Sequence, residues 1–377
     1  MTGRSVLVVT PSADGYGSDR ALIGVVRAMS RHFAPTVVSA VEGPTLDVLR
    51  SLGAEVIVAP DFALRRRYMT PRGIVPAAVR VVRAAALLRR LHRQRRFVGV
   101  YVNTVANLLL PVVSMAVPVP VVVHAREVPR ATAVQRALLI GSVQRVADRL
   151  LTNSAHTAEA FRSMDGRLSG RIRVVHDGVD DPGFVARRGA PGNTALEIVC
   201  VGRLHPQKGQ HVLLEAVAAT VASGANLRVH FWGDALPEHA GIERDLRASA
   251  ARLGLEERVV WHGYGSDASA MYAGMDVAVV PSTWPEGFSL VTAEAQAAGL
   301  PVIATVPGGP ADIVVDGETG RLVPAEDPAA IRAALDECSD PSVRERWGDA
   351  GRERHLERFT TERSADAVAA SVAELFG

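Results

Sequence analysis

Short apolar runs alternate along this chain with longer segments in which apolar residues recur at helical spacing. In the first half, the runs at residues 5–10, 36–41, 55–59, 98–102, 119–124, 149–153 and 172–175 have the pattern of buried strands. The segments between them, at residues 18–31, 45–52, 104–116, 132–147 and 155–163, and an arginine-rich region that ends at Arg96, have the pattern of helices. This alternation predicts a parallel sheet with helices on both faces.

The same alternation begins again after residue 193. Residues 177–193 are rich in glycine, proline and aspartate, which is the composition of a linker. Strands are then predicted at residues 197–201, 227–232, 258–262, 276–280 and 301–305, with helices between them and a charged helical segment at the end of the chain. In two doubly wound units joined by a linker, the carboxyl ends of the strands border a cleft in which ligands bind.

We therefore expect four segments in the chain. Residues 1–183 should form an N-terminal Rossmann-like domain that binds an acceptor, and residues 184–194 should form a linker. Residues 195–355 should form a second Rossmann-like domain that binds a donor. Residues 356–377 should form a C-terminal helix that packs back toward the N-terminal domain.

The charges are distributed unevenly over the two halves. The whole chain has 377 residues and a net charge of +2, but residues 1–189 contain 27 Arg, no Lys and 13 acidic residues, which is +14. The remainder contains 14 Arg, one Lys and 27 acidic residues, which is −12. The asymmetry is typical either of two domains that attract each other across a cleft or of a basic half that faces an anionic partner.

The composition excludes several classes of protein. Only Cys200 and Cys338 are present, so a disulfide framework is not expected and a reducing cytoplasm fits. The chain does not begin with a basic segment followed by an apolar signal core. Residues 97–123 carry no charge, but Pro111, Pro118 and Pro120 interrupt them, so a strand, a helix and a second strand explain them better than a transmembrane helix does.

Residues 284–301 have the strongest local pattern in the chain. Glu286 lies in a turn made by Pro285 and Gly287, and Ser289 is the expected N-cap of the helix that follows. Glu294 lies inside this helix, Gly299 is its expected left-handed C-cap, and Pro301 blocks its continuation. Two carboxylates that can bind hydroxyl groups, with free helical N–H groups between them for an anion, suit a sugar nucleotide. A surface helix with two solvated glutamates is the alternative interpretation.

The loop after the strand at 197–201 carries two cations. Gly202, Arg203 and Lys208 lie in a βα loop, where a guanidinium fork and an ammonium group five residues apart suit a diphosphate. Lys208 is the only lysine of the chain, whereas every other basic position apart from histidine is arginine.

Two further candidates lie at strand ends in the first half. Gly15 and Gly17 allow a ligand to approach the backbone closely, but they lack the spacing of a dinucleotide fingerprint or a P-loop, so the glycines by themselves favour a simple tight turn. His124 ends a predicted strand and is followed by Arg126 and Glu127. It is either a ligand-binding residue or a packed structural histidine.

These motifs together resemble those of retaining GT-B glycosyltransferases of family 4, the glycosyltransferase group 1 type. The matching stretches are residues 202–210, the Glu286/Glu294 pair with seven residues between them, and the segments 307–310 and 316–320. Residues 175–180 are similar to the segment that usually closes the first domain of the family. The resemblance is long and specific in the C-terminal half and weaker in the N-terminal half. It implies an α/β protein with two doubly wound Rossmann-like domains facing across a cleft.

The resemblance also implies roles for residues of the C-terminal half. Glu294 would bind the ribose, and Glu286 would bind hydroxyl groups of the donor sugar together with backbone N–H groups of Gly287, Phe288, Ser289 and Leu290. Arg203 and Lys208 would neutralise the departing diphosphate without a metal ion or a cofactor. The sequence has no Asp-X-Asp motif, in agreement with this expectation. Gly202 and Gly233 would approach the nucleotide, and Tyr264 would contact its base.

In the N-terminal half the implied roles concern the reaction centre and the acceptor. Amides of Gly15 and Gly17 would lie near the phosphates, and His124 would lie beside the O6 side of the sugar. Tyr16, Arg126 and Glu127 would bind the acceptor, which is a glycan, a lipid-linked molecule or a small molecule with a hydroxyl group. A nucleotide-sugar epimerase and a non-catalytic nucleotide-sugar-binding protein are the alternative functions.

The segment from Arg65 to Arg96 is basic and amphipathic. It contains many arginines among valines and leucines, a pattern found in segments that lie on anionic bilayers. We expect a cytoplasmic protein, with this segment either in peripheral contact with the inner face of the plasma membrane or forming a solvated helix face. Nucleic-acid binding is not expected, because no aromatic residues are interleaved with these charges and no nucleic-acid-binding module is recognisable.

Overall fold

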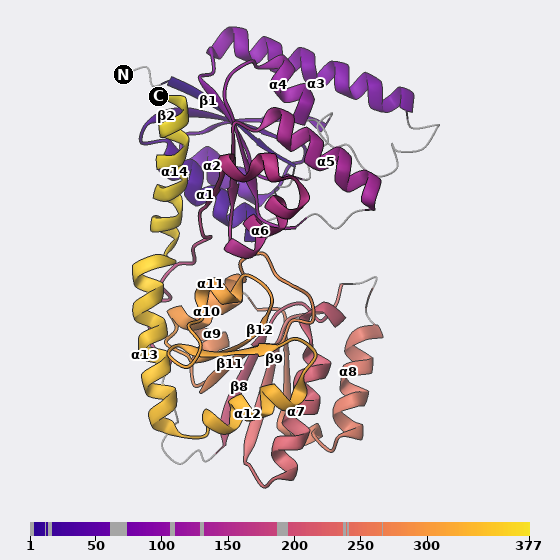
Figure 1. Cartoon of the computed structure of the whole chain (residues 1–377), viewed down its shortest axis with the longest axis vertical. Coiled ribbons are helices and arrows are strands. Elements are labelled where there is room, and N and C mark those ends of the chain that lie inside the picture. The colour runs from indigo at the N-terminus through magenta and orange to yellow at the C-terminus, as the bar shows by residue number, and fades with distance from the viewer. Residues whose placement is uncertain are drawn as a thin grey trace. The chain divides into compact units, whose positions relative to one another are not determined.

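The protein consists of two compact units, seen in a computed structural model (Figure 1). The structure describes residues 4–11, 13, 17–60, 74–105, 110–128, 132–186, 195–236, 239, 241–265 and 267–377. Unit 1 comprises Met1–Gly178 and Thr361–Gly377, and unit 2 comprises Val179–Thr360. The chain therefore passes between the units at residues 178–179 and again at 360–361, and not at the expected boundaries near residues 184 and 356.

Within the described residues, unit 1 contains a seven-stranded parallel sheet in the order β3-β2-β1-β4-β5-β6-β7. Its strands are β1 (Arg4–Thr10), β2 (Phe33–Ser39), β3 (Glu55–Val58), β4 (Gly99–Val102), β5 (Val121–Ala125), β6 (Arg149–Thr152) and β7 (Ile172–Val174). The strand order reverses between β1 and β4, which is the arrangement of a doubly wound sheet. The valine-rich runs form these strands because both faces of a parallel sheet are buried.

Two helical layers cover the sheet of unit 1. The helices are α1 (Gly17–Met29), α2 (Pro44–Ser51), α3 (Ile74–Arg95), α4 (Leu110–Ala116), α5 (Ala133–Val146), α6 (Ala155–Met164) and α14 (Thr361–Phe376), with a 3₁₀ turn at Gly166–Arg171. Leu7 and Val9 of β1 pack in the core that includes α3, α4 and α5. Val6 and Val8 pack in the other core, with α1, α2 and α14. Successive side chains of a strand thus pack against opposite helical layers.

The C-terminal helix α14 is part of unit 1. Phe376 is 7% exposed and packs edge-to-face on Phe33 with ring centroids 6.3 Å apart. A Cβ atom at Gly99 would collide with the Phe376 ring, so β4 needs glycine at this position. Arg149, at the start of β6, binds Glu374 and the carbonyl oxygen of Ser371. Helix α14 therefore packs in the same hydrophobic core as β1, although the two elements are far apart in the sequence.

Within the described residues, unit 2 contains a six-stranded parallel sheet in the order β10-β9-β8-β11-β12-β13. Its strands are β8 (Leu196–Val201), β9 (Leu227–Trp232), β10 (Val259–Gly263), β11 (Val277–Val280), β12 (Val302–Val306) and β13 (Gly320–Pro324). Its helices are α7 (Gln210–Ala222), α8 (Gly241–Arg252), α9 (Ala268–Tyr272), α10 (Leu290–Ala297), α11 (Pro310–Ile313), α12 (Pro328–Glu337) and α13 (Pro341–Arg358). In this sheet the order reverses between β8 and β11.

Strand β13 was not predicted from the sequence. Its five residues begin with glycine and end with proline, and only two of them are buried, so the local pattern is weak. Pairing with β12 in a parallel register makes it a strand, since Val302 lies opposite Gly320 and Thr305 opposite Val323. A Cβ atom at Gly320 would collide with the carbonyl oxygen of Val302.

The expected linker is partly incorporated into the two units. Asp177 is buried in unit 1, and Val179 pairs with Thr360 in unit 2. Ala186 is 3% exposed and donates its backbone N–H to Ala298, so the described residues 184–186 belong to unit 2. The rest of the expected linker, residues 187–194, lies outside the described residues.

The uncharged residues 97–123 contain β4, α4 and β5, in agreement with the strand–helix–strand prediction. Among the helices that the structure describes, none is long and apolar enough to cross a bilayer.

Candidate functional site

Two loops meet where the strand order of unit 2 reverses. The loop after β8 and the loop after β11 are joined by hydrogen bonds from Thr283, whose N–H reaches the carbonyl of Gln207 at 2.9 Å and whose Oγ reaches the carbonyl of Pro206 at 3.1 Å. Gly209 has a φ of 68°, and a Cβ atom there would collide with the carbonyl oxygen of Pro281. The close packing of the two loops therefore requires glycine at 209 and fixes the position of Lys208 beside it.

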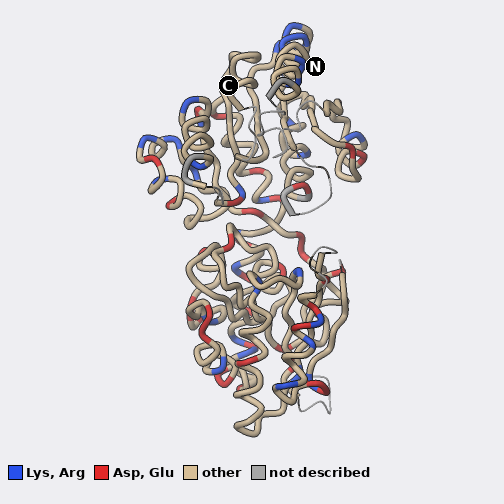
Figure 2. Tube along the Cα trace, turned by 90° about the vertical axis from the view of Figure 1, so that its right-hand side faces the viewer, with Lys and Arg blue, Asp and Glu red and all other residues tan. Residues whose placement is uncertain are grey.

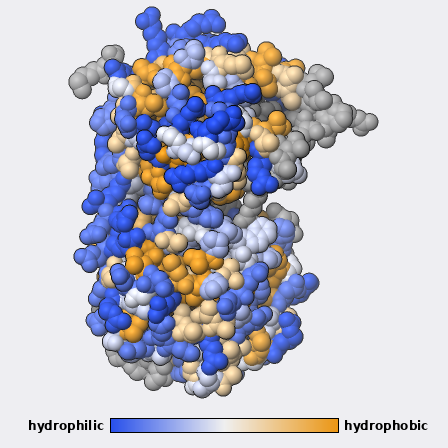
Figure 3. All heavy atoms as spheres, viewed as in Figure 1, coloured by the Kyte–Doolittle hydropathy of each residue, from blue (hydrophilic) through white to orange (hydrophobic). Residues whose placement is uncertain are grey.

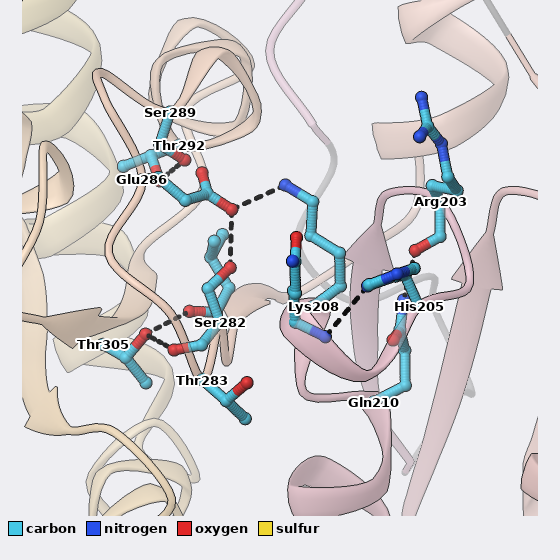
Figure 4. Close-up of polar contacts among 12 residues, drawn as sticks. Arg203, His205, Lys208, Gln210, Ser282, Thr283, Glu286, Ser289, Thr292 and Thr305 are labelled. Atoms are coloured by element: carbon cyan, nitrogen blue, oxygen red, sulfur yellow. Dashed lines mark hydrogen bonds and ion pairs between the residues drawn. The ribbon is translucent and has the colours of Figure 1, made fainter. Parts of the chain in front are cut away.

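Lys208 and Glu286 form an ion pair at this place (Figure 4). Lys208 Nζ lies 2.6 Å from Glu286 Oε1, and Ser282 Oγ donates to the same oxygen at 2.5 Å. The side chains of Lys208 and Glu286 are 35% and 16% exposed. Burial by itself would raise the pKa of Glu286, but the charge of Lys208 and hydrogen bonds from Lys208, Ser282 and Ser289 outweigh it and hold the pKa below its ordinary value. Glu286 is therefore an anion at neutral pH.

Ser289 takes an unusual conformation at the start of α10. It occupies the N-cap position, as predicted, but its φ of 78° is left-handed and its side chain does not cap the helix. Instead, its hydroxyl group donates to Glu286 and lies 2.9 Å from Oγ1 of the buried Thr292. A left-handed conformation is unfavourable for a residue other than glycine, so the surrounding contacts must hold it.

The glycine-rich segment at residues 307–310 packs against the loop that contains Glu286. Gly309 donates its N–H to the carbonyl of Glu286 at 3.0 Å. A Cβ atom at Gly309 would collide with the backbone of Gly287 and Phe288. The motif at residues 307–310, which contributes to the family resemblance, thus fixes the backbone around Glu286.

The strain at Ser289 can be tested with two variants. Ser289→Ala and Ser289→Gly both remove the hydroxyl group, but only glycine relieves the left-handed strain. We expect Ser289→Gly to be more stable than Ser289→Ala by about 1 kcal/mol. Because both lose one hydrogen bond to Glu286, both should lose a similar fraction of any activity that needs this carboxylate. Thermal unfolding and turnover measured side by side separate the two effects, and equal stability of the variants would contradict the strain.

Glu294 lies on α10, where the sequence predicted it. Its carboxylate accepts a hydrogen bond from Tyr272 Oη at 3.3 Å. Tyr272 is fully buried, and burial raises the pKa of its hydroxyl group well above the ordinary value, so the group remains a donor. The end of α10 is also as predicted, because Gly299 has a φ of 74° and Leu300 donates to the carbonyl of Ala295 in a Schellman motif.

The remaining donor-site candidates surround the same edge of the sheet. Arg203 is exposed on the β8 loop and extends away from the ion pair (Figure 4). Gly202 and Gly233 contact each other, since a Cβ atom at Gly233 would collide with the carbonyl of Gly202. Tyr264 follows β10 and is 75% exposed. Their predicted contacts with a nucleotide stay predictions.

The side chains of Phe288 and Leu290 pack in a hydrophobic cluster of unit 2. Phe288 is 2% exposed and lies in a cluster with Val179, Ile313 and Phe359, with the two phenyl centroids 5.7 Å apart. Leu290 packs against the same cluster. The contact of their backbone N–H groups with a donor sugar, which the sequence analysis assigned to them, stays a prediction.

In unit 1 the candidate His124 is a buried residue of β5. It is 1% exposed, and its Nδ1 lies 2.7 Å from Tyr101 Oη on the neighbouring strand β4. Arg126 also lies inside the unit, where its side chain is 8% exposed and forms an ion pair with the equally buried Asp177. The predicted contact of Arg126 with an acceptor stays a prediction. Glu127 is exposed.

The first glycine loop is only partly described. Gly15 and Tyr16 lie outside the described residues, and Gly17 is the first residue of α1. No group of three or more metal-ligating side chains occurs within the part of the chain that the structure describes.

Several site residues were not predicted from the sequence. Ser282 could have been found, because it follows β11 at the edge where the sequence already placed Glu286. Thr292, Tyr272 and Tyr101 carry no sequence signal of this kind, since buried hydroxyl groups acquire their roles from neighbours distant in sequence.

The two Rossmann-like units place the protein in the GT-B fold class. The structure of Anabaena Alr3699/HepE in complex with UDP and glucose matches 98% of this chain and 99% of that protein with a TM-score of 0.80 and 22% identity. Sucrose-phosphate synthase from Thermosynechococcus elongatus matches 99% of this chain and 98% of its own with a TM-score of 0.72 and 20% identity. At such identities these similarities define the fold.

The sequence comparisons define the family of the second unit. Residues 187–354 match the family model Glycosyl transferases group 1, so this segment is a domain of that family. The D-inositol 3-phosphate glycosyltransferase of Geodermatophilus obscurus is 37% identical over 257 residues, which are 63% of this chain and 55% of that protein. The enzyme of the same name from Streptomyces avermitilis is 36% identical over 251 residues, 62% of this chain and 53% of that protein. The chain spans about half the length of these curated relatives.

Proposed function

We propose that this protein is a retaining, metal-independent glycosyltransferase that moves a sugar from a nucleoside-diphosphate donor to a hydroxyl acceptor. The observation that carries the proposal is the Lys208–Glu286 ion pair at the switch point of the unit 2 sheet, beside the N-terminus of α10. Such switch points are where ligands bind in doubly wound sheets. The group 1 glycosyltransferase domain at residues 187–354 contains the whole arrangement.

The ion pair suggests how the donor is bound. A diphosphate would take Lys208 as its counter-ion, and a sugar hydroxyl group would donate to Glu286 in place of the ammonium group. Each partner of the pair then exchanges one interaction for another, so neither group is left without a polar partner. A nucleoside diphosphate without a sugar offers no hydroxyl group to Glu286, which favours binding of the intact donor.

The same groups would stabilise the departure of the diphosphate. When the anomeric bond breaks, the leaving diphosphate gains negative charge, and a fixed ammonium group with helical N–H groups favours this state over the bound donor. Retention of anomeric configuration and independence from metal ions follow from the resemblance to family 4 and are part of the proposal.

Donor and acceptor can be proposed as classes. The complex of HepE with UDP and glucose makes a uridine diphosphate sugar the first donor to test. The relatives named D-inositol 3-phosphate glycosyltransferase make a phosphorylated polyol the first acceptor. The excess of basic residues in residues 1–189, with 27 Arg against 13 acidic residues, favours an acceptor that carries negative charge.

The decisive experiment incubates the protein with a panel of nucleotide sugars, with and without inositol 3-phosphate, after removal of divalent metal ions. We expect acceptor-dependent release of nucleoside diphosphate and a product with the anomeric configuration of the donor, read by NMR. Release that is independent of any acceptor would favour an epimerase or a hydrolase instead. Donor binding without any release would favour the non-catalytic alternative.

Glu294 provides a prediction that separates binding from turnover. Glu294→Ala should weaken binding of the nucleotide by about tenfold, because a charge-assisted hydrogen bond to a ribose hydroxyl group is lost. Titration calorimetry with the nucleoside diphosphate measures this effect. Glu318→Ala, which removes an exposed carboxylate of the same unit, is the matched control. If both variants bind the nucleoside diphosphate with equal affinity, Glu294 does not bind the ribose.

We also propose that unit 1 contacts an anionic bilayer. Helix α3 contains no acidic residue (Figure 2), and neither α4 nor α5 contains one. The outer surface of α3 exposes Arg83, Arg89, Arg90 and Arg93. Among the side chains of these three helices that the structure describes, the exposed large hydrophobic ones are Val79, Val82, Met115 and Leu138. Figure 3 shows hydrophobic and hydrophilic residues mixed over this part of unit 1, a combination that suits a bilayer surface.

The bilayer contact predicts a dependence on lipid charge. The protein should float with liposomes that contain phosphatidylglycerol, and remain unbound to phosphatidylcholine liposomes. Binding should weaken at high salt because screening shortens the range of the attraction. Replacing Arg89, Arg90 and Arg93 with glutamine should reduce flotation, whereas the same change at Arg332 and Arg346 in unit 2 should not. Flotation that ignores lipid charge contradicts the proposal.

A further inference from the structure

Ser289 and Thr292 form a buried pair of hydroxyl groups beside Glu286 (Figure 4). Their side-chain oxygen atoms lie 2.9 Å apart, and the two residues are 7% and 0% exposed. Each hydroxyl group has one proton to donate and can also accept. Because Ser289 donates its proton to the Glu286 carboxylate, Thr292 must donate its own to Ser289 Oγ. The two hydroxyl groups therefore form a relay that runs from α10 to the carboxylate.

This relay replaces the ordinary N-cap of α10. A serine at the N-cap position usually accepts a hydrogen bond from a backbone N–H of the first turn, which stabilises the helix. Ser289 makes no such bond with its side chain, and its φ of 78° is left-handed. Both features cost free energy, and such strain typically occurs where the residue has a function. In this conformation the hydroxyl group reaches Glu286 instead of capping the helix.

A third hydroxyl group reaches Glu286 from the loop after β11. Ser282 is 3% exposed, and its Oγ donates to Glu286 Oε1 at 2.5 Å. Its backbone is held by Thr305 of β12, whose Oγ1 donates to the Ser282 carbonyl oxygen at 2.6 Å (Figure 4). Ser282 and Ser289 are thus buried donors that the fold keeps in place. A carboxylate that accepts several hydrogen bonds is stabilised in its ionised form.

Lys208 differs from these two donors because it can leave Glu286. Its side chain is 35% exposed and long, whereas both serines are short and buried. In the proposed function, Lys208 becomes the counter-ion of the donor diphosphate. The positive charge 2.6 Å from Glu286 is then withdrawn in the same state in which the sugar needs the carboxylate. Burial alone would favour the protonated form of Glu286 in this state.

Other titratable groups lie on the elements around Glu286. They are Cys200 on β8, Arg203 and His205 on the loop after β8, Glu294 on α10 and Asp312 on α11. Burial raises the pKa of Cys200 to about 12, so its thiol is uncharged. His205 Nδ1 accepts from a backbone N–H, which a protonated imidazole cannot do. Arg203 extends away from the ion pair, and the other two groups are acidic. When Lys208 leaves, the hydroxyl groups therefore carry the stabilisation of the carboxylate.

We propose that Thr292 and Ser289, together with Ser282, keep the Glu286 carboxylate ionised at neutral pH after Lys208 has moved to the diphosphate of a bound donor. The identity of this donor rests on the proposed function. Glu286 then accepts a sugar hydroxyl group as an anion while Lys208 neutralises the leaving group. Thr292 is fully buried and is a positioning residue that acts through Ser289.

The relay can be tested without any ligand, because Lys208→Met withdraws the lysine charge as donor binding would. In protein labelled with ¹³C at the side-chain carboxyl of glutamate, the resonance that disappears in Glu286→Gln belongs to this carboxylate. In Lys208→Met it should titrate below neutral pH. Adding Ser289→Gly should move the titration midpoint to higher pH by about one unit, which is the effect expected from the loss of one hydrogen bond.

Thr292 is tested in the same Lys208→Met protein. Thr292→Val keeps the shape of the side chain but removes the hydroxyl group, so it should move the midpoint in the same direction by a smaller amount. Thr292→Ser keeps the hydroxyl group and should leave the midpoint in place. An unchanged midpoint in Ser289→Gly would overturn the proposal. A shift in Ser289→Gly without one in Thr292→Val would contradict the role of Thr292.

The pH dependence of the reaction separates this role from a structural one. The profile of kcat/KM reports the free protein, and that of kcat reports the donor complex. In Ser289→Gly and Thr292→Val the acidic limb of kcat should move to higher pH and lie above that of kcat/KM, because in the free protein Lys208 still stabilises the carboxylate. Thr220→Val, which removes another buried helical hydroxyl group of unit 2, should move neither limb.

The kinetic outcomes also distinguish the relay from the proposed function. If sugar is transferred and the acidic limb of kcat stays in place in both variants, the relay does not keep Glu286 ionised and the proposal is wrong. If the wild-type protein transfers no sugar from any nucleotide donor, the proposed function fails. The titration of Glu286 in Lys208→Met still decides the relay in that case.

Discussion

Replacing Lys208 with methionine should lower kcat for glycosyl transfer by about 100-fold to 1000-fold. Methionine keeps most of the length of the side chain but removes the charge that lies 2.6 Å from Glu286. The diphosphate then leaves without its counter-ion, so the transition state is destabilised more than the bound donor. Steady-state kinetics with saturating donor measure the loss, and Arg332→Met, which removes a surface cation of the same unit, should leave kcat unchanged.

The same substitution should also change the pH dependence. In the wild-type protein the pKa of Glu286 is below its ordinary value, so the carboxylate is lost only as the pH falls through this lowered pKa. Without Lys208, burial is opposed only by the serine hydroxyl groups, and the pKa of Glu286 rises. As the pH is lowered, activity that depends on the Glu286 carboxylate should therefore be lost at a higher pH in Lys208→Met than in the wild type.

A double-mutant cycle tests whether the two residues act together. If Lys208 and Glu286 exchange their mutual contact for contacts with the donor, the losses in Lys208→Met and Glu286→Gln should not add in the double variant. If kcat of Lys208→Met falls by less than tenfold while donor binding is intact, Lys208 is only a structural partner of Glu286 and does not stabilise the transition state.

Asp177→Ala should destabilise unit 1 by about 3–5 kcal/mol, which is a large part of the stability of a typical domain. Both members of the Arg126–Asp177 pair are 8% exposed, so removing the carboxylate leaves a buried guanidinium group without its counter-ion. Asn153 also loses an acceptor. The double variant Arg126→Met, Asp177→Leu should recover much of the loss, since a well-packed apolar pair carries no charge to bury.

The positions of the tryptophans allow unfolding of the two units to be followed separately. All four tryptophans, at positions 232, 261, 284 and 347, lie in unit 2, so their fluorescence reports unfolding of that unit. Circular dichroism reports both units. Asp177→Ala should lower the urea midpoint of the circular dichroism signal while the fluorescence midpoint stays constant. Asp47→Asn, at an exposed pair with Arg50, is the control and should change neither signal; equal behaviour of the two variants would contradict the prediction.

Much of the fold could be predicted from local pattern. Strand β9 was predicted with its observed bounds, and most other predicted strands agree within two residues because valine-rich runs between helical segments have few alternative structures. β13 was missed because its burial comes from pairing with β12 and not from its own residues. The division of the C-terminal segment, with α13 in unit 2 and α14 in unit 1, depends on cores formed by residues far away in sequence.

The candidate site divides in the same way. Sequence alone placed Lys208 in a loop after one strand and Glu286 in a loop after another, and gave both a ligand-binding role. It could not bring them together, because they are 78 residues apart and meet only since β11 pairs with β8. The left-handed conformation of Ser289, the hydrogen bond from Ser282 to Glu286 and the contact between Tyr101 and His124 likewise could not be predicted from local pattern.

The sequence by itself determined which segments are strands, which loops carry charge and which family the second unit resembles, because these depend on periodicity, turn chemistry and short motifs. The tertiary structure decided which charges are paired and which buried polar atoms lack a partner among the described residues. Lys208 and Glu286 neutralise each other because two strand ends are adjacent, and His124 points one nitrogen at Tyr101 because β4 and β5 are neighbours. Such pairings depend on distances of a few ångströms between remote residues, which only the folded chain sets.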